Sequence, residues 1–143
     1  MTFIGSGFLI KNIKKTVKKY NLTSVLFHNK LSRDEVISKL DIADCLIMIS
    51  EDEAFGLVYL EAMARGCIVI ASLNEGMDGI IVDGQNGFLC KSGDKKDLTK
   101  KLKYISQLTN EELIKVKKNA IATSKNYSDE KVASDYLSKI SLK

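Results

Sequence analysis

The sequence predicts an α/β protein with a doubly wound parallel sheet and helices on both faces, a Rossmann-like arrangement. Short apolar runs alternate with helical patterns, which requires crossovers between parallel strands. Two runs, residues 44–49 and 67–71, are almost continuously apolar, as in strands buried on both faces of a sheet. The chain has no internal repeat and no low-complexity linker. We therefore expect one domain over residues 1–143, with C-terminal helices over about 109–140.

Composition excludes several classes of function. Hydrophobic residues make up 45% and charged residues 28% of the 143 residues, as in ordinary globular proteins. The net charge of +4 is best explained by solvated lysines on helix faces, with contact to an anionic membrane surface or to phosphate-bearing substrates as the weaker alternative. No apolar run approaches the roughly 20 residues of a membrane span, and no signal-peptide pattern is present. We expect a cytoplasmic protein without a nucleic-acid partner, with the inner face of the membrane as the alternative location.

Metal-binding and disulfide patterns are also missing. The three cysteines are isolated, odd in number and next to apolar runs, so they are interpreted as buried reduced thiols: Cys45, Cys67 and Cys90. His28 has no Ser or Asp partner pattern, and we interpret it as a loop or surface residue. Asp78 and Asp83 lie in glycine-rich turns, where aspartate is common for backbone reasons. The sequence predicts no metal site.

The first half of the chain contains three short strands and two helices. Leu9, Ile13 and Val17 have helical spacing, and Ser32 with Glu35 has the spacing of a capping box. The expected elements are a strand at 2–4, a helix over about 8–20, a strand at 25–27, a helix over about 32–40 and a strand at 44–49.

The second half continues the alternation. Gly66 is expected to cap the C-terminus of a helix, and Thr109 with Glu112 forms a second capping box. The expected elements are a helix from Phe55 to Arg65, a strand at 67–71, glycine-rich turns around apolar runs at 80–82 and 87–90, a helix over about 94–108, a helix from 109, and a last helix capped by Ser128 and ending near Ile140.

One loop combines the features of a ligand site. Ligands of open parallel sheets bind at the carboxyl ends of the strands, and residues 50–56 follow the buried strand 44–49. Glu61 lies among apolar residues of the next helix, so we expect it to be well buried and to need hydroxyl donors such as those of a ribose. Glu53 precedes the helix, and the backbone N–H groups of residues 54–57 favour an anion. The spacing alone does not indicate a glycosidase pair.

A second loop, Gly5-Ser6-Gly7, lies between a strand and a helix. It resembles a dinucleotide fingerprint, but the third glycine is replaced by Ile10. A tight turn explains these residues, and a ligand contact is the alternative.

The segment from Ser50 to Gly66 resembles the signature of the C-terminal, donor-binding domain of retaining family 4 glycosyltransferases, glycosyl transferases group 1, which have the GT-B fold. The matching residues are Ser50, Glu53, Phe55, Gly56, Leu57, Glu61, Ala62, Met63, Ala64 and Gly66. Three shorter matches occur in the same order: Ile4-Gly5-x-Gly7, Val25-x-Phe27 and Asn86-Gly87-Phe88-Leu89. The resemblance covers about residues 3–108.

This resemblance implies a nucleotide sugar as donor substrate, no further cofactor and no metal. Glu53 would be the catalytic residue at the hydroxyls of the donor sugar, and Glu61 would bind the ribose hydroxyls. The donor would also contact Ser50, the amides of Phe55, Gly56 and Leu57, the base-binding loop of Asn29, Lys30 and Leu31, and Gly5 and Gly7.

The chain departs from the family pattern at three positions. Ile68 replaces a proline, and Asn29 replaces a glycine whose left-handed geometry asparagine can still adopt. Gly79 replaces a glutamate, a variant that resembles a subset linked to bacterial surface polysaccharides.

The family's diphosphate-clamping Arg and Lys, which precede the matched region, have no counterpart, so the sheet is expected to lack its first strand and helix. We expect this chain alone to bind a nucleoside diphosphate weakly and to transfer no sugar, because an N-terminal acceptor domain or subunit is needed as partner. The alternatives are a non-catalytic remnant or subunit that needs a second polypeptide, and an epimerase or phosphorylase of GT-B architecture. No lysine site for pyridoxal phosphate is identified.

Overall fold

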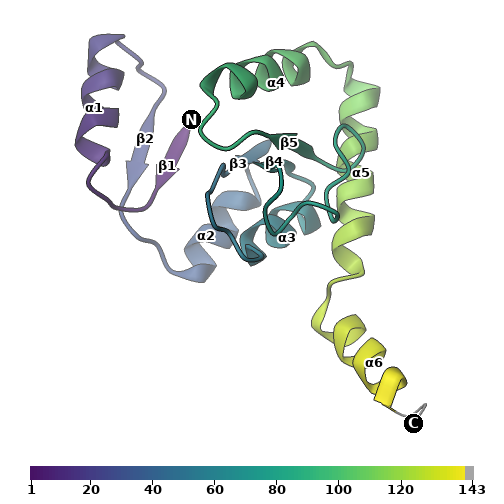
Figure 1. Cartoon of the computed structure of the whole chain (residues 1–143). Helices are drawn as coiled ribbons and strands as arrows, with labels where there is room; N and C mark the ends of the chain where they lie inside the picture. The colour runs from purple at the N-terminus through teal and green to yellow at the C-terminus, as the bar shows by residue number, and fades with distance from the viewer. Residues whose placement is uncertain (141–143) are drawn as a thin grey trace. The chain divides into compact units, whose positions relative to one another are not determined.

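The computed structural model describes residues 1–140 (Figure 1). Its internal contacts divide the chain into two compact units, Met1–Ser38 and Lys39–Lys143. Each unit has its own parallel sheet, of two strands in the first and three in the second. The α/β class with parallel sheets and flanking helices is thus confirmed. The grouping of both units into one domain stays a prediction.

The first unit is a single strand–helix–strand motif. It consists of β1 (Thr2–Ile4), α1 (Ile10–Lys19) and β2 (Leu26–His28), and the two strands pair in parallel. Phe3 lies opposite Phe27, and their rings stack with centroids 5.3 Å apart. The strands lie close to their predicted positions, while α1 begins two residues later than expected.

Helix α2 (Arg33–Leu40) spans the boundary of the units, and its N-terminus has the predicted capping box. The Ser32 N–H donates to the Glu35 carboxylate at 2.8 Å, and the Glu35 N–H donates back to the Ser32 hydroxyl at 3.4 Å. Two N–H groups that the helix leaves unpaired are satisfied in this way.

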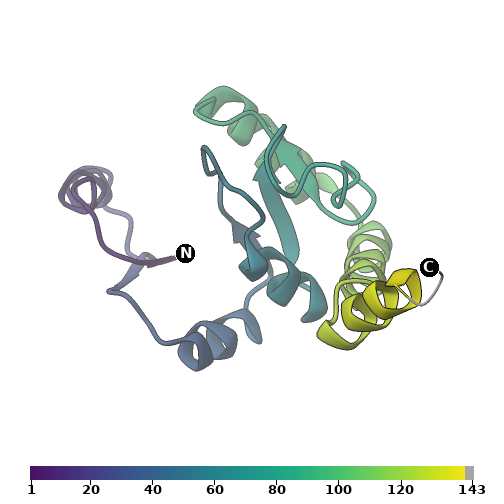
Figure 2. The same cartoon turned by 60° about the horizontal axis from the view of Figure 1, so that its bottom comes forward.

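The second unit is a three-stranded sheet covered by helices. The strands run in the order β3-β4-β5 and all pair in parallel (Figure 2). The elements are β3 (Cys45–Ile47), α3 (Leu57–Ala64), β4 (Ile68–Ser72), β5 (Phe88–Cys90), α4 (Lys95–Gln107), α5 (Asn110–Lys125) and α6 (Asp129–Ile140). Side chain caps begin α4 at Asp94 and α5 at Thr109, where the second predicted capping box is present.

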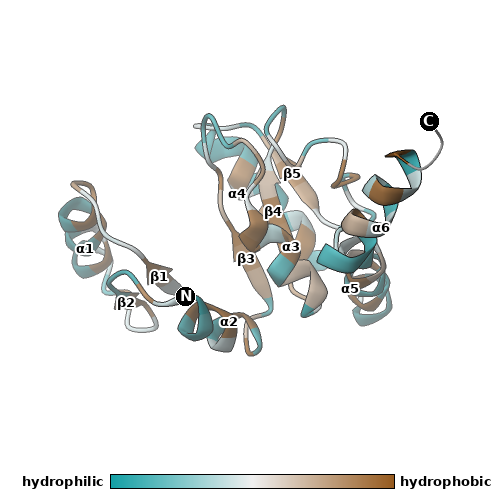
Figure 3. Ribbon diagram, turned by 90° about the horizontal axis from the view of Figure 1, so that it is seen from below, coloured by the Kyte–Doolittle hydropathy of each residue, from teal (hydrophilic) through white to brown (hydrophobic). Residues whose placement is uncertain are grey.

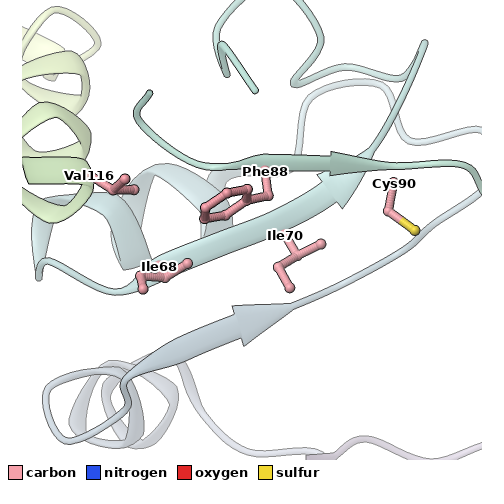
Figure 4. Packing of buried hydrophobic residues seen from close by; sticks show 5 residues of the cluster. All are labelled: Ile68, Ile70, Phe88, Cys90 and Val116. Carbon is pink, nitrogen blue, oxygen red and sulfur yellow. The ribbon is translucent and has the colours of Figure 1, made fainter. Parts of the chain in front are cut away.

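The central strand β4 is buried along its whole length. Alternate side chains of a strand point to opposite faces, so Ile68 and Ile70 lie on one face and Val69 and Ala71 on the other. The first face packs against α4 and α5 in a cluster that includes Val116 of α5 (Figure 4). The second face is covered by α3, which lies beside α5. Helices therefore cover both faces of β4, as predicted.

Strand β3 differs from the prediction. Its residues were expected to be buried on both faces, but all three are only half-buried. The reason is its position, because β3 is the outer strand of the three-stranded sheet and has a neighbour on one side in that sheet. Figure 3 shows hydrophobic colour concentrated on β3, β4 and β5, with hydrophilic colour on parts of the surrounding helices α4 and α5.

The three thiols are free. Cys67 and Cys90 are buried as expected, whereas Cys45 is half-buried. Burial, followed by the nearby Cys67 and Asp44, raises the pKa of Cys45 to about 12, and burial followed by Asp97 raises that of Cys90 to about 11. The pKa of Cys67 is raised mainly by burial as well. No helix among residues 1–140 is long and apolar enough to cross a membrane.

Replacing Ile70 by Ala should lower the free energy of unfolding by about 2–5 kcal/mol, because it removes a fully buried side chain from the cluster on β4. Ile114→Ala is the matched control, since Ile114 is 51% exposed on α5 and should change stability by no more than about 0.5 kcal/mol. Urea unfolding of both variants measures the difference. Equal losses would show that the described core is wrong.

In the folded chain, Cys45 and Cys90 should react with a thiol reagent at pH 8 at least about a hundredfold more slowly than in guanidinium, because only thiolates react and the raised pKa values keep these two thiols protonated. Below these pKa values the thiolate fraction of Cys45 and Cys90 grows about tenfold per pH unit, so their labelling rate should rise steadily with pH and level off only at about pH 11 to 12. Fast labelling of one cysteine in the native protein would contradict its described burial.

Candidate functional site

The loop of residues 48–56 leaves the carboxyl end of β3 and leads into α3. Two hydroxyls hold its first half: Tyr59 donates to the Met48 carbonyl at 2.7 Å, and Ser72 donates to the Ser50 carbonyl at 2.6 Å. Both donors are 1% exposed. Burial is the main cause that raises the pKa of Tyr59, so its hydroxyl remains a donor at neutral pH. The predicted site residue Ser50 thus acts through its backbone in this structure.

A carboxylate from the next loop holds the second half. Glu75, three residues beyond β4, accepts the N–H of Glu53 at 2.8 Å and that of Asp52 at 3.2 Å. The Gly76 N–H donates to the Glu53 carbonyl at 2.9 Å, so the two loops are bonded in both directions. Sequence reasoning did not identify Glu75 as a site residue. The available signal was an acidic residue beside a glycine at the carboxyl end of a buried strand.

Two residues of the loop have left-handed backbone. Asp52 has φ +59°, a conformation that costs a non-glycine residue on the order of 1 kcal/mol. Gly56 has φ +73° and directly precedes α3. A Cβ atom at Gly56 would lie 2.5 Å from the Tyr59 ring and 3.4 Å from the Glu53 carboxyl carbon. Only glycine fits, and this close approach places the Glu53 carboxylate beside the start of α3.

The start of α3 presents backbone donors. No hydrogen bond within the described residues occupies the N–H groups of Ala54, Phe55 and Gly56, and Leu57 is the first helical residue. These groups lie at the positive end of the helix dipole. The Phe55 ring lies 6.4 Å from the ring of Tyr127, a contact that ties this loop to the end of α5. The amides that the sequence analysis assigned to an anion therefore lie at one helix end, and their binding of an anion stays a prediction.

Glu61 is half-buried, which corrects the prediction that it is well buried. The buried side chains of α3 are Tyr59, Leu60, Ala62 and Met63. Glu61 shares a different stripe with Leu57, four residues before it, and Ala64, three residues after it, and both of these are exposed. Its carboxylate therefore lies on the side of α3 that the core does not cover.

The other predicted contacts belong to the unit Met1–Ser38. Gly5 and Gly7 line a hollow of about 310 Å³ whose wall is mostly apolar. Asn29 and Lys30 are exposed after β2 and Leu31 is half-buried, and Asn29 does not adopt the left-handed backbone. The roles expected for these residues at the nucleotide stay predictions. In the second unit, the structure brings Ser50, Glu53, the 55–57 amides and Glu61 onto one loop and its helix.

Residues that were not assigned to the site have structural partners or lie apart from it. Asp78 accepts the Asn74 N–H at 2.9 Å, and Asp83 accepts the Leu89 N–H at 2.9 Å and pairs with Lys101. His28 lies on β2, and its Nε2 atom is buried without a hydrogen bond in the described structure. Among residues 1–140, no three His, Cys, Asp or Glu side chains are grouped so that they could hold a metal ion.

The geometry offers donors and acceptors in one place. Free N–H groups at a helix start suit a phosphate, and a carboxylate beside them accepts hydrogen bonds from hydroxyls. A second carboxylate, on the exposed stripe of α3, extends the acceptor surface along the helix. A ligand that carries both phosphates and several hydroxyls would match this arrangement.

Comparison with known proteins identifies the family of this chain. The family model of glycosyl transferases group 1 matches residues 1–125. An uncharacterized glycosyltransferase of Methanocaldococcus jannaschii is 37% identical over 129 residues, which are 90% of this chain and 36% of that protein. The chain thus spans about a third of the length of this relative.

Solved structures show the same fold. The Anabaena protein HepE in complex with UDP-glucose matches with a TM-score of 0.81 at 21% identity, over 99% of this chain and 40% of that one. The crystallised C-terminal domain of a glycosyl transferase group 1 protein, LpcC, from Francisella tularensis matches with a TM-score of 0.74 at 28% identity, over 83% and 62% of the two chains. The chain therefore belongs to the glycosyl transferases group 1 family and has the fold of a C-terminal domain of a GT-B glycosyltransferase.

Proposed function

We propose that this chain is the donor-binding half of a retaining glycosyltransferase of family 4 and that its donor is a nucleoside diphosphate sugar. The observation that carries the proposal is the combination of unoccupied N–H groups at residues 54–56 with the Glu53 carboxylate at the start of α3. The same loop carries the family signature, and the family model covers it. A phosphate alone would explain the N–H groups but not the adjacent carboxylate.

The diphosphate would bind at the start of α3. Its negative charge is favoured there by the helix dipole and by the unoccupied N–H groups that precede the first helical residue. During transfer, charge builds on the departing diphosphate, and donors that are already in place stabilise it without reorganisation. The unoccupied amides of Phe55 and Gly56 and the amide of Leu57, the first helical residue, are the groups that we propose do so, with Ala54 next to them.

The two carboxylates would bind hydroxyls. Glu53, which lies beside Gly56, would accept hydrogen bonds from the donor sugar next to the phosphates. Glu61 lies further along α3 on the exposed stripe and would accept the ribose hydroxyls. A half-buried carboxylate suits this role because it stays accessible to the ligand while its burial limits competition from water.

The relatives suggest which donor to try first. HepE was solved with UDP-glucose, so UDP and UDP-glucose are the first probes. We further infer from the Gly79 variant a role in bacterial surface polysaccharide or glycoconjugate synthesis. A location in the cytoplasm or at the inner face of the membrane remains a separate proposal. The expectation that no metal takes part stays a prediction.

Replacing Glu61 by Ala should weaken binding of UDP and of UDP-glucose alike, by about tenfold, because the ribose is common to both. Glu53→Ala should leave UDP binding unchanged and weaken UDP-glucose, because only the sugar contacts Glu53. Isothermal titration calorimetry measures both affinities, and Glu130→Ala, at an exposed residue of α6, is the control. Equal losses for UDP and UDP-glucose in both variants would refute this division of roles.

The 143-residue chain should bind UDP but transfer no sugar by itself, because it spans about a third of a relative and acceptor binding is assigned to the remainder. A transfer assay with UDP-glucose, run with Mg²⁺ and with EDTA, tests this, and UDP affinity should be the same in both buffers. Robust turnover by the chain alone would contradict the proposal. Absence of transfer even with an acceptor-domain partner would favour a non-catalytic subunit.

A further inference from the structure

We propose that Glu75 is a positioning residue of the donor site, whose carboxylate holds the loop of residues 50–56 in the backbone conformation that aims Glu53. This inference rests on the proposed donor binding, because it assigns to Glu75 an effect on the sugar contact of Glu53. Glu75 is not among the residues that match the family signature. Its role follows from contacts between two loops that are distant in the sequence.

Glu75 uses both carboxylate oxygens on the loop. Oε2 accepts the Glu53 N–H at 2.8 Å, and Oε1 accepts the Asp52 N–H at 3.2 Å. Hydrogen bonds to a charged acceptor are stronger than neutral ones, and this pair fixes two consecutive peptide groups. The residue that these bonds hold, Glu53, is also the residue whose side chain lies beside Gly56.

The backbone that Glu75 holds, at Asp52 and Glu53, has an unfavourable conformation at the first of these residues. Asp52 is left-handed, and consecutive N–H groups next to a left-handed residue form a concave anion site. The Glu75 carboxylate occupies this concavity. The N–H groups of Asp52 and Glu53 are therefore unavailable to a ligand, which leaves those of residues 54–56 for the phosphates.

The partner loop is itself fixed close to the first. The Gly76 N–H donates to the Glu53 carbonyl, and a Cβ atom at Gly76 would lie 2.5 Å from the carbonyl carbon of Ala54. Gly76 has no left-handed φ, so glycine is required here by contact between the loops and not by backbone conformation. This close approach brings the Glu75 carboxylate within reach of the two amides.

The experiment compares Glu75→Ala with Asp78→Ala. Asp78 is the matched control because its carboxylate also accepts a backbone N–H, that of Asn74, but within its own loop. Amide hydrogen exchange followed by NMR on the 143-residue chain should be faster by about tenfold or more at Asp52 and Glu53 in Glu75→Ala. Asp78→Ala should leave these two amides unchanged. Unchanged exchange in Glu75→Ala would overturn the proposal.

Ligand binding provides the second readout. In Glu75→Ala the affinity for UDP-glucose should fall by about tenfold more than the affinity for UDP, as in Glu53→Ala, while Asp78→Ala should match the unmodified chain. Glu75→Gln keeps the size of the side chain and one acceptor oxygen. Its loss of affinity for UDP-glucose should therefore lie between that of Glu75→Ala and that of the unmodified chain. Faster exchange without a selective loss of UDP-glucose would show a merely structural role and overturn the proposal.

Amide exchange and ligand affinity together distinguish a failure of this proposal from a failure of the proposed function. An unmodified chain with no measurable affinity for UDP or UDP-glucose would contradict the donor-binding function. Amide exchange needs no ligand, so it would still decide whether Glu75 holds the loop. If Glu75→Ala fails to fold, as a lost thermal transition would show, Gly76→Ala tests the same contact between the loops: faster exchange at Glu53 supports the contact, and unchanged exchange contradicts it.

Discussion

The bonded contact between the loops after β3 and β4 is the constraint on which the candidate site depends. The parallel sheet brings the carboxyl ends of these strands together, but it does not determine the path of the loops beyond them. That path is set by Glu75 on two amides, by Gly76 against Ala54, and by two buried hydroxyls at the strand ends. With the loop in place, the Glu53 carboxylate lies beside the start of α3, where we propose that the donor binds.

Backbone and side chains have different tasks in this arrangement. The N–H groups at the start of α3 supply positive potential without a titratable charge, while Glu53 and Glu61 are the carboxylates that we propose accept hydrogen bonds from hydroxyls. A carboxylate beside a phosphate would be repelled unless hydroxyls lie between them, so the arrangement favours a ligand with phosphates and a sugar over a simple anion. The Glu75 carboxylate is stabilised in another way, because it accepts hydrogen bonds from two backbone amides of the loop.

Local sequence signals predicted the elements well. The capping boxes at Ser32 and Thr109 and the glycine after α3 are short-range patterns, and the structure contains all three. Properties that depend on tertiary contacts were predicted less well. The exposure of Glu61 depends on which stripe of α3 meets the core, and the role of Glu75 depends on a partner 22 residues away. Neither can be read from neighbouring residues, so both required the structure.

Binding of a nucleoside diphosphate at the start of α3 can be followed residue by residue in a titration of the ¹⁵N-labelled chain with UDP. We expect saturable amide shifts at Phe55, Gly56 and Leu57, with the turn around Gln85, at the opposite end of β5, unaffected. Saturable shifts confined to that turn or to α6, with none at residues 55–57, would show that the nucleotide does not bind at the start of α3.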